Sequence, residues 1–129
     1  MRGRILADLL ADTYAFIEAF AGNERYARIF RHRTVVTTAL NVLEVYAILL
    51  RRLERADARS HALSLIPYVS QVAPESAIAA AEFRQTMRDR HRDCSYIDAW
   101  GYTAARTVGA RFLTGDPAFK GLENVEFVR

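Results

Sequence analysis

The chain of 129 residues contains a single cysteine, Cys94, so it cannot form an internal disulfide bond. This scarcity is typical of a reducing compartment, and we expect the protein in the cytoplasm. Its longest apolar run, around Val42 to Leu50, contains Glu44 and falls far short of the roughly 20 residues that cross a bilayer. We therefore expect no membrane contact.

Motifs of several common functional sites are also missing. There is no Gly-rich phosphate-binding loop, and His91-x-x-Cys94 is at most half of a zinc site, without a second pair. The sequence has no internal repeat, low-complexity segment or linker, so its length predicts a single domain over residues 1–129. Hydrophobic residues make up 51% of the chain, which excludes a disordered tail protein.

Lysine is nearly absent, because Lys120 is the only lysine among 18 basic residues. The formal net charge is +3, so the chain has a mild basic bias carried by arginine. Arginine suits bidentate contacts to phosphate and stacking on bases. Genomic codon bias would produce the same excess, so the arginine content alone does not establish a nucleic-acid partner.

Hydrophobic periodicity and turn signals predict alternating strands and helices. We expect strands at 5–11, 34–37, 68–72, 111–113 and 124–128, and helices at 12–20, 24–31, 39–55, 58–65, 74–90 and 95–108. Within the third helix, an apolar stripe recurs at helical spacing, at Leu40, Leu43, Ala47 and Leu50. This alternation predicts an α/β layer structure with a mostly parallel sheet, whose sites lie at the carboxyl ends of the strands.

Three acidic residues stand where helix caps are also expected. Asp12 precedes Thr13 at a strand-to-helix turn, and Asp116 precedes Pro117. Asp98 follows Ser95 by three positions, which is the spacing of a capping box. Taken singly, each has an ordinary structural explanation.

Glu44 is harder to explain, because its neighbours in the helix are apolar and it shares a face with Asn41. It either reaches solvent at the edge of the apolar stripe or is paired or metal-bound. If the fold brings Glu44 together with the three aspartates, like charges raise each other's pKa, and a divalent cation relieves the conflict. Asp8 shares strand parity with Asp12 and is the alternative first acid.

The order of these motifs resembles a PIN domain, most closely the VapC-like toxins of prokaryotic toxin–antitoxin pairs. Four stretches carry the resemblance: LLADTYAFIEAFAGNERY at 9–26, VVTTALNVLEVYAILLRR at 35–52, SYIDAWGYTAA at 95–105 and FLTGDPAFKGLENVEFV at 112–128. The resemblance implies a three-layer α/β/α sandwich with a central, mostly parallel sheet. It also implies a site for one or two Mg²⁺ or Mn²⁺ ions, formed by Asp12, Glu44, Asp98 and Asp116.

The resemblance further implies a metal-dependent endoribonuclease, in which Thr13, Asn41 and Thr114 orient ligands or waters. Arginines that could guide RNA toward the acids are Arg51, Arg52, Arg84, Arg88 and Arg92. A solvated helix face explains any one of them as well. The alternatives are a PIN-fold binding module with little or no catalysis, a housekeeping RNA-processing nuclease, and a phosphoacceptor receiver domain, although Lys120 is poorly placed for the last.

Such toxins usually dimerise and bind a small antitoxin, so we expect both partners. Two groups of apolar residues on neighbouring helices are available for these contacts. They are Tyr46, Ile48 and Leu49 on the first helix and Leu63, Leu65 and Ile66 on the second. Burial in the core would explain these residues equally well.

Overall fold

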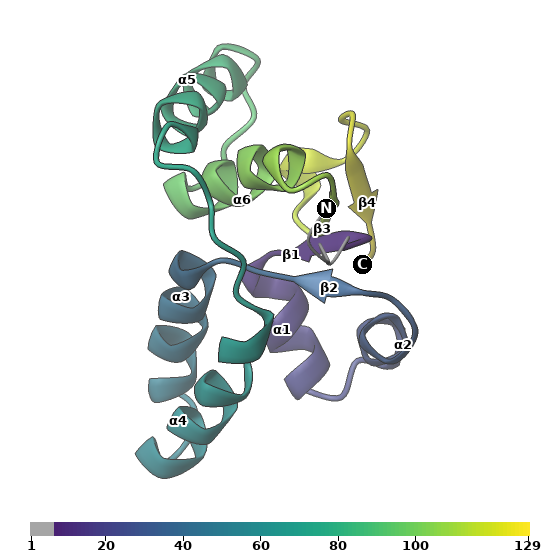
Figure 1. Ribbon diagram of the computed structural model, residues 1–129, viewed down its shortest axis with the longest axis vertical. Coiled ribbons are helices and arrows are strands. Elements are labelled where there is room, and N and C mark those ends of the chain that lie inside the picture. Colours follow the sequence, from purple (N-terminus) through teal and green to yellow (C-terminus); the bar gives the residue numbers. More distant parts are fainter. Residues whose placement is uncertain (1–6) are drawn as a thin grey trace, which may run out of the picture.

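A four-stranded parallel sheet forms the centre of the fold (Figure 1). The computed structural model describes residues 7–129. The strand order is β2-β1-β3-β4, with bounds β1 Leu9–Ala11, β2 Val35–Val36, β3 Arg111–Thr114 and β4 Val125–Phe127. The predicted α/β/α sandwich with a parallel sheet is thereby confirmed.

Within the described residues, six α-helices and two 3₁₀ turns pack around this sheet. The helices are α1 Thr13–Phe20, α2 Glu24–His32, α3 Ala39–Leu50, α4 Arg55–Ser64, α5 Ser76–Asp89 and α6 Tyr96–Thr107, and the turns are η1 Ile66–Tyr68 and η2 Pro117–Phe119. In the described part of the chain, no helix is long and apolar enough to cross a membrane.

Side chains of each strand alternate between two hydrophobic clusters. Leu9 and Ala11 pack with residues of α1–α4, whereas Leu10 between them packs with residues of α5 and α6. In β3, Phe112 joins the α5–α6 cluster and Leu113 joins the other. Figure 1 shows the same division, with α5 and α6 on one side of the sheet and α1, α3 and α4 on the other.

The three predicted aspartate caps are all present. Asp12 accepts a hydrogen bond from Ala15 N at the start of α1, and Asp116 accepts one from Ala118 N at the start of η2. Ser95 and Asp98 form a reciprocal capping box at the start of α6. Each acid is therefore held in place by the same bonds that begin a helix.

The expected helix over 39–55 is wrong, because α3 ends at Leu50 and α4 begins at Arg55. No glycine or proline signals this break in the sequence. The chain turns because α4 folds back onto α3 through the small buried residues Ala58 and Ala62. The helix expected to begin at residue 58 starts at Arg55 instead, so Asp57 lies inside the first turn of α4.

Two further boundaries differ from expectation. The expected strand at 68–72 is absent; only Val69 bridges to Thr37, and the chain then leaves the sheet. The first strand begins at Leu9, while residues 5 and 6 of the expected strand lie outside the described residues.

The apolar stripe of α3 faces outward rather than toward the core. Leu43 is 61% exposed and Leu40 is 39% exposed, whereas the buried face consists of Asn41, Val45 and Leu49. The helix is apolar on both faces, so periodicity did not distinguish the buried face from the exposed one.

Gly101 allows α6 to approach β3 closely, because a Cβ at this position would lie 2.8 Å from Cε1 of the fully buried Phe112. Gly→Ala inside a helix normally stabilises it. Here we expect Gly101→Ala to lower the free energy of unfolding by about 1–3 kcal/mol through overpacking. Urea denaturation would measure it. The double variant Gly101→Ala/Phe112→Leu should recover part of the loss, and a stabilising Gly101→Ala would contradict the packing argument.

Candidate acidic site

The four predicted acids lie around one open pocket of about 480 Å³. Asp12 follows β1 and Asp116 lies in the TGD turn after β3, so both lie at the carboxyl end of the sheet. Glu44 reaches the pocket from the middle of α3, and Asp98 from the first turn of α6. Four segments distant in sequence thus contribute one carboxylate each.

Asp8 lies at the opposite end of β1 and does not line this pocket. Its carboxylate accepts a hydrogen bond from Thr34 N at 3.2 Å and lies 3.5 Å from Arg33 Nε. The geometry therefore favours Asp12 over Asp8 as the first acid of the site.

Asp12 is the most deeply buried of the four acids, with 1% of its surface exposed. Burial, together with the smaller effect of the nearby charges of Asp98 and Asp116, raises the pKa of its carboxyl group to about 8. Hydrogen bonds from the Thr114 hydroxyl and from Ala15 N oppose the shift. In the absence of a cation, Asp12 is therefore largely protonated at neutral pH.

Asp98 is less buried, and desolvation is again the main reason that its pKa is raised, here to about 6. The charges of Asp116 and Glu44 add to the increase, while hydrogen bonds with Ser95 lower the pKa. The shifts at Asp12 and Asp98 show that the four carboxylates interact electrostatically across the pocket.

Thr114 connects two of the acids. Its hydroxyl donates to Asp12 Oδ2 at 2.5 Å and accepts from Asp116 N at 3.0 Å. Because Thr114 is fully buried at the end of β3, it fixes the relative positions of Asp12 and the Asp116 turn.

A second buried relay supports the other wall of the pocket. Thr38 Oγ1 donates to Asn41 Oδ1 at 2.6 Å, and Asn41 Nδ2 donates to Thr13 Oγ1 at 3.2 Å. Thr13 lines the pocket, so α3 is tied to the start of α1 directly beside Asp12. Asn41 thus acts through Thr13 rather than by facing the pocket itself.

The oxygen donors of this pocket suit a hard cation such as Mg²⁺ or Mn²⁺. Within residues 7–129, however, no three His, Cys, Asp or Glu side chains converge closely enough to form a ready-made metal cluster. Mg²⁺ usually keeps several waters and takes only one or two carboxylates directly. The residues therefore fit a hydrated ion, with the remaining acids bound through water, rather than a closed cage.

The predicted RNA-guiding arginines are not equivalent in the structure. Only Arg52 lines the acidic pocket. Arg84 Nε donates to Cys94 O at 2.9 Å, and its guanidinium lies 4.0 Å from the centre of the Tyr96 ring. Arg92 donates to the carbonyls of the η2 segment at residues 118 and 120. Arg51 and Arg88 are exposed and lie outside the pocket.

Several pocket residues were not anticipated from the sequence, among them Tyr14, Glu18, Ser95 and Arg129. Tyr14 and Glu18 are four residues apart on α1, so their spacing could have placed both on one face beside Asp12. No sequence signal pointed to Arg129, because its place depends on how the chain returns after β4.

Residues 9–124 match the PIN domain family, so the chain belongs to this family. The match covers all four acids of the pocket. Lys120 does not line the pocket, and its Nζ lies 5.7 Å from the centre of the Phe127 ring, so a receiver-type site is not formed.

The fold is similar to solved toxin structures. A chain of a toxin–antitoxin complex from Klebsiella pneumoniae superposes with a TM-score of 0.74 at 16% identity, over 92% of this chain and 96% of that one. VapC20 of Mycobacterium tuberculosis, described as a toxin that cleaves the sarcin–ricin loop, superposes with a TM-score of 0.70 at 23% identity. The match covers 92% of this chain and 99% of that one. A chain of VapBC2 from Rickettsia felis, bound to promoter DNA, superposes with a TM-score of 0.71 at 12% identity. The match covers 93% of this chain and 96% of that one. No curated protein matches the chain in sequence.

The raised pKa of Asp12 predicts a pH-dependent cost of folding. The unfolded chain ionises Asp12 near its ordinary pKa of 3.8, whereas the folded, metal-free protein holds the proton until about pH 8. Stability is therefore lost as pH rises through this window. Asp12→Asn should remove this loss, because an amide does not ionise. The asparagine oxygen can still accept the capping hydrogen bond from Ala15 N.

We expect Asp12→Asn to stabilise the protein in chelator by about 2 kcal/mol or more at pH 8, and by much less at pH 5. Chemical denaturation at both pH values would measure the difference, with Asp8→Asn as the matched control at the opposite end of β1. An equal effect of Asp12→Asn at the two pH values would contradict the assigned pKa.

Proposed function

We propose that this protein is a Mg²⁺- or Mn²⁺-dependent endoribonuclease and the toxin of a toxin–antitoxin pair, acting in the cytoplasm. The observation that carries the proposal is the convergence of Asp12, Glu44, Asp98 and Asp116 on one pocket in a PIN-family chain. PIN domains are generally nucleases, and a similar structure belongs to a toxin named for cleaving an RNA loop, which supports RNA as the substrate.

The roles of the acids follow from their burial and contacts. Asp12 and either Asp98 or Asp116 would bind one or two ions directly, and Glu44, half-buried on α3, would bind directly or through water. The bound ion would lower the pKa of a water ligand and neutralise charge on the scissile phosphate. The resemblance to VapC-like toxins implies that hydrolysis would leave 5′-phosphate and 3′-hydroxyl ends. Thr114 and Thr13 would hold Asp12 and the neighbouring waters in position.

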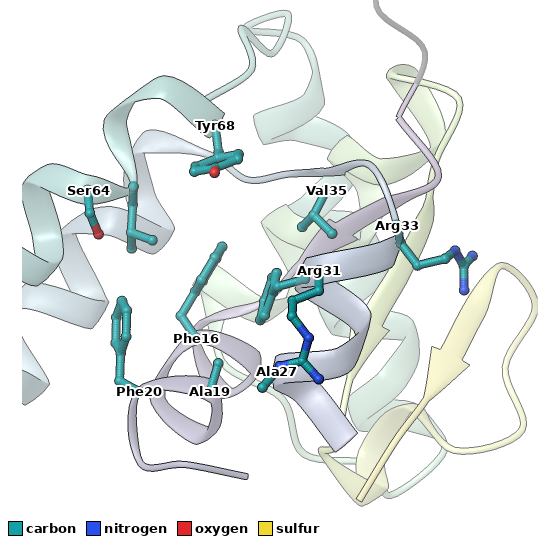
Figure 2. A pocket seen from close by; sticks show the side chains of 11 residues that line it. Phe16, Ala19, Phe20, Ala27, Arg31, Arg33, Val35, Ser64 and Tyr68 are labelled. Carbon is teal, nitrogen blue, oxygen red and sulfur yellow. The ribbon is translucent and has the colours of Figure 1, made fainter. Parts of the chain in front are cut away.

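An antitoxin partner is supported by the similar structures, several of which are toxin–antitoxin complexes. The chain offers an apolar groove of about 390 Å³ between α1, α2 and the α4–η1 segment. Figure 2 shows Phe16, Phe20 and Tyr68 around this groove, with Arg31 and Arg33 on one side. We propose that an amphipathic antitoxin segment places apolar side chains among these rings.

A homodimer is the second assembly that we propose. The outer faces of α3, α4 and η1 expose Leu43, Leu63 and Ile66, which are 61%, 55% and 53% accessible. These leucines and isoleucine line a shallow apolar depression that a second copy would cover. Of the apolar residues expected to be free for partners, Leu49 and Leu65 are instead buried in the core.

The alternative function is a PIN-fold binding module with weak or no catalysis, and a housekeeping RNA-processing nuclease is a third possibility. The intact set of four acids favours catalysis over a pure binding role. Absence of Mn²⁺ binding at neutral pH would favour the binding module. The gene neighbourhood separates toxin from housekeeping enzyme, because a toxin requires an adjacent short frame encoding an antitoxin.

The nuclease proposal predicts that Asp98→Asn lowers Mg²⁺-dependent cleavage of single-stranded RNA by at least about 100-fold. The asparagine can still cap α6 but cannot carry the negative charge that a cation requires. Product gels with purified protein would measure cleavage, and chelator should abolish the wild-type activity. Asp8→Asn is the matched control and should cleave normally. Full activity of a folded Asp98→Asn protein would contradict the nuclease proposal.

The two proposed surfaces predict opposite behaviour for two variants. Leu43→Glu should give a monomer that still binds the polypeptide encoded by the adjacent short frame. Phe20→Asp should remain a dimer but lose that polypeptide, because a carboxylate enters the apolar groove. Light scattering and co-purification would measure the two properties, and each variant is the control for the other. If both variants lose both properties, the surfaces are wrongly assigned.

A further inference from the structure

Two guanidinium groups share the pocket with the four acids. Arg52 lies just after α3, four residues beyond Ile48 and eight beyond Glu44, and all three line the pocket. Arg129 follows β4 and reaches the pocket from the other end of the chain.

Arg129 is anchored at both its main chain and its side chain. Its Nη1 donates to Gly115 O at 2.6 Å, in the turn that carries Asp116. Its own carbonyl accepts from Arg25 Nη1 at 2.5 Å. The guanidinium is thus held beside the acids by one neutral backbone group, Gly115 O.

Neither guanidinium is neutralised by the acids that surround it. Among the ion pairs of residues 7–129, none involves Arg52 or Arg129. By contrast, Arg33 and Arg111 both pair with Glu126. A guanidinium carries five N–H donors in a rigid fork, and contacts among residues 7–129 use only one of those of Arg129.

Positive groups that line an acidic pocket without pairing to its acids are available for an anion that approaches from solvent. We propose that Arg52 and Arg129 form a phosphate clamp, binding the backbone phosphates of single-stranded RNA on either side of the carboxylates. This proposal rests on the nuclease function proposed above. The planar fork matches two phosphate oxygens, and a contact of this kind explains how a pocket with four carboxylates admits a polyanion.

The clamp also narrows the set of arginines that contact RNA. The Arg84 side chain already contacts Cys94 O and the Tyr96 ring. The Arg92 side chain already donates to the carbonyls of Ala118 and Lys120. Arg129 was not in the predicted set, whereas Arg52 was. Both clamp residues line the pocket, and among residues 7–129 neither is paired with an acid.

The test measures RNA binding without cleavage. Asp98→Asn protein in Mg²⁺ is titrated against a fluorescein-labelled single-stranded RNA, and anisotropy is followed at several salt concentrations. In this Asp98→Asn background, Arg52→Ala and Arg129→Ala should each raise the Kd for the RNA about 10-fold. Each should also flatten the slope of log Kd against log salt by about 0.7, the contribution of one phosphate contact on a single strand. Arg129→Lys should restore the slope but only part of the affinity.

Arg90→Ala, which removes an exposed arginine away from the acidic pocket, is the matched control and should leave both quantities unchanged. Unchanged Kd and slope in Arg129→Ala would show that this residue only fastens the end of the chain. Tighter binding would show that its guanidinium blocks the pocket. Either outcome overturns the clamp, as does the absence of any RNA binding by Asp98→Asn protein.

Failure of the clamp is distinguishable from failure of the nuclease proposal. Wild-type cleavage together with unaltered binding in the arginine variants would remove the clamp alone. Weakened binding and a flattened slope, without cleavage by the wild type, would support the clamp and remove the nuclease. Melting temperatures of all variants verify folding, and the charge-conserving Arg129→Lys retains a donor for Gly115 O.

Discussion

The burial of one carboxyl group is the constraint on which the site depends. Asp12 lies at the end of a central strand, begins a helix by capping Ala15, and accepts a hydrogen bond from Thr114 on the neighbouring strand. Burial without a counter-charge is unfavourable for a carboxylate, so in the free protein the group retains its proton at neutral pH. The energetic cost of keeping an acid there is offset only when a cation or a proton accompanies it.

The same bonds that define the secondary structure therefore also position the site. Each of the three aspartates caps a helix or a 3₁₀ turn, and Glu44 is carried by a helix whose first turn is fastened by Thr38 and Asn41. Caps restrict side-chain rotation, so the acids are held at defined positions before any ligand arrives. Such preorganisation is what a site for charge stabilisation requires.

Much of this arrangement could be predicted from the sequence, because helix caps and strand ends leave local signals. The positions of Asp12, Asp98 and Asp116 followed from such signals, and their convergence followed from the general rule for parallel sheets. Long-range packing leaves no local signal, which is why the turn between α3 and α4 was expected after residue 55 rather than at residues 51–54, and why the outward face of Leu43 was not predicted. Arg129 was missed for the same reason, since only the path of the chain after β4 brings it to Gly115.

Leu43 and Glu44 are adjacent on α3, so about 100° of helical rotation separates an exposed leucine from an acid of the pocket. The helix is a rigid rod of 12 residues fixed by the buried side chains of Asn41, Val45 and Leu49. Any turn of this rod about its axis moves the outer surface and the glutamate together. A substitution at one of its buried positions would therefore displace the exposed surface around Leu43 and the carboxylate of Glu44 together.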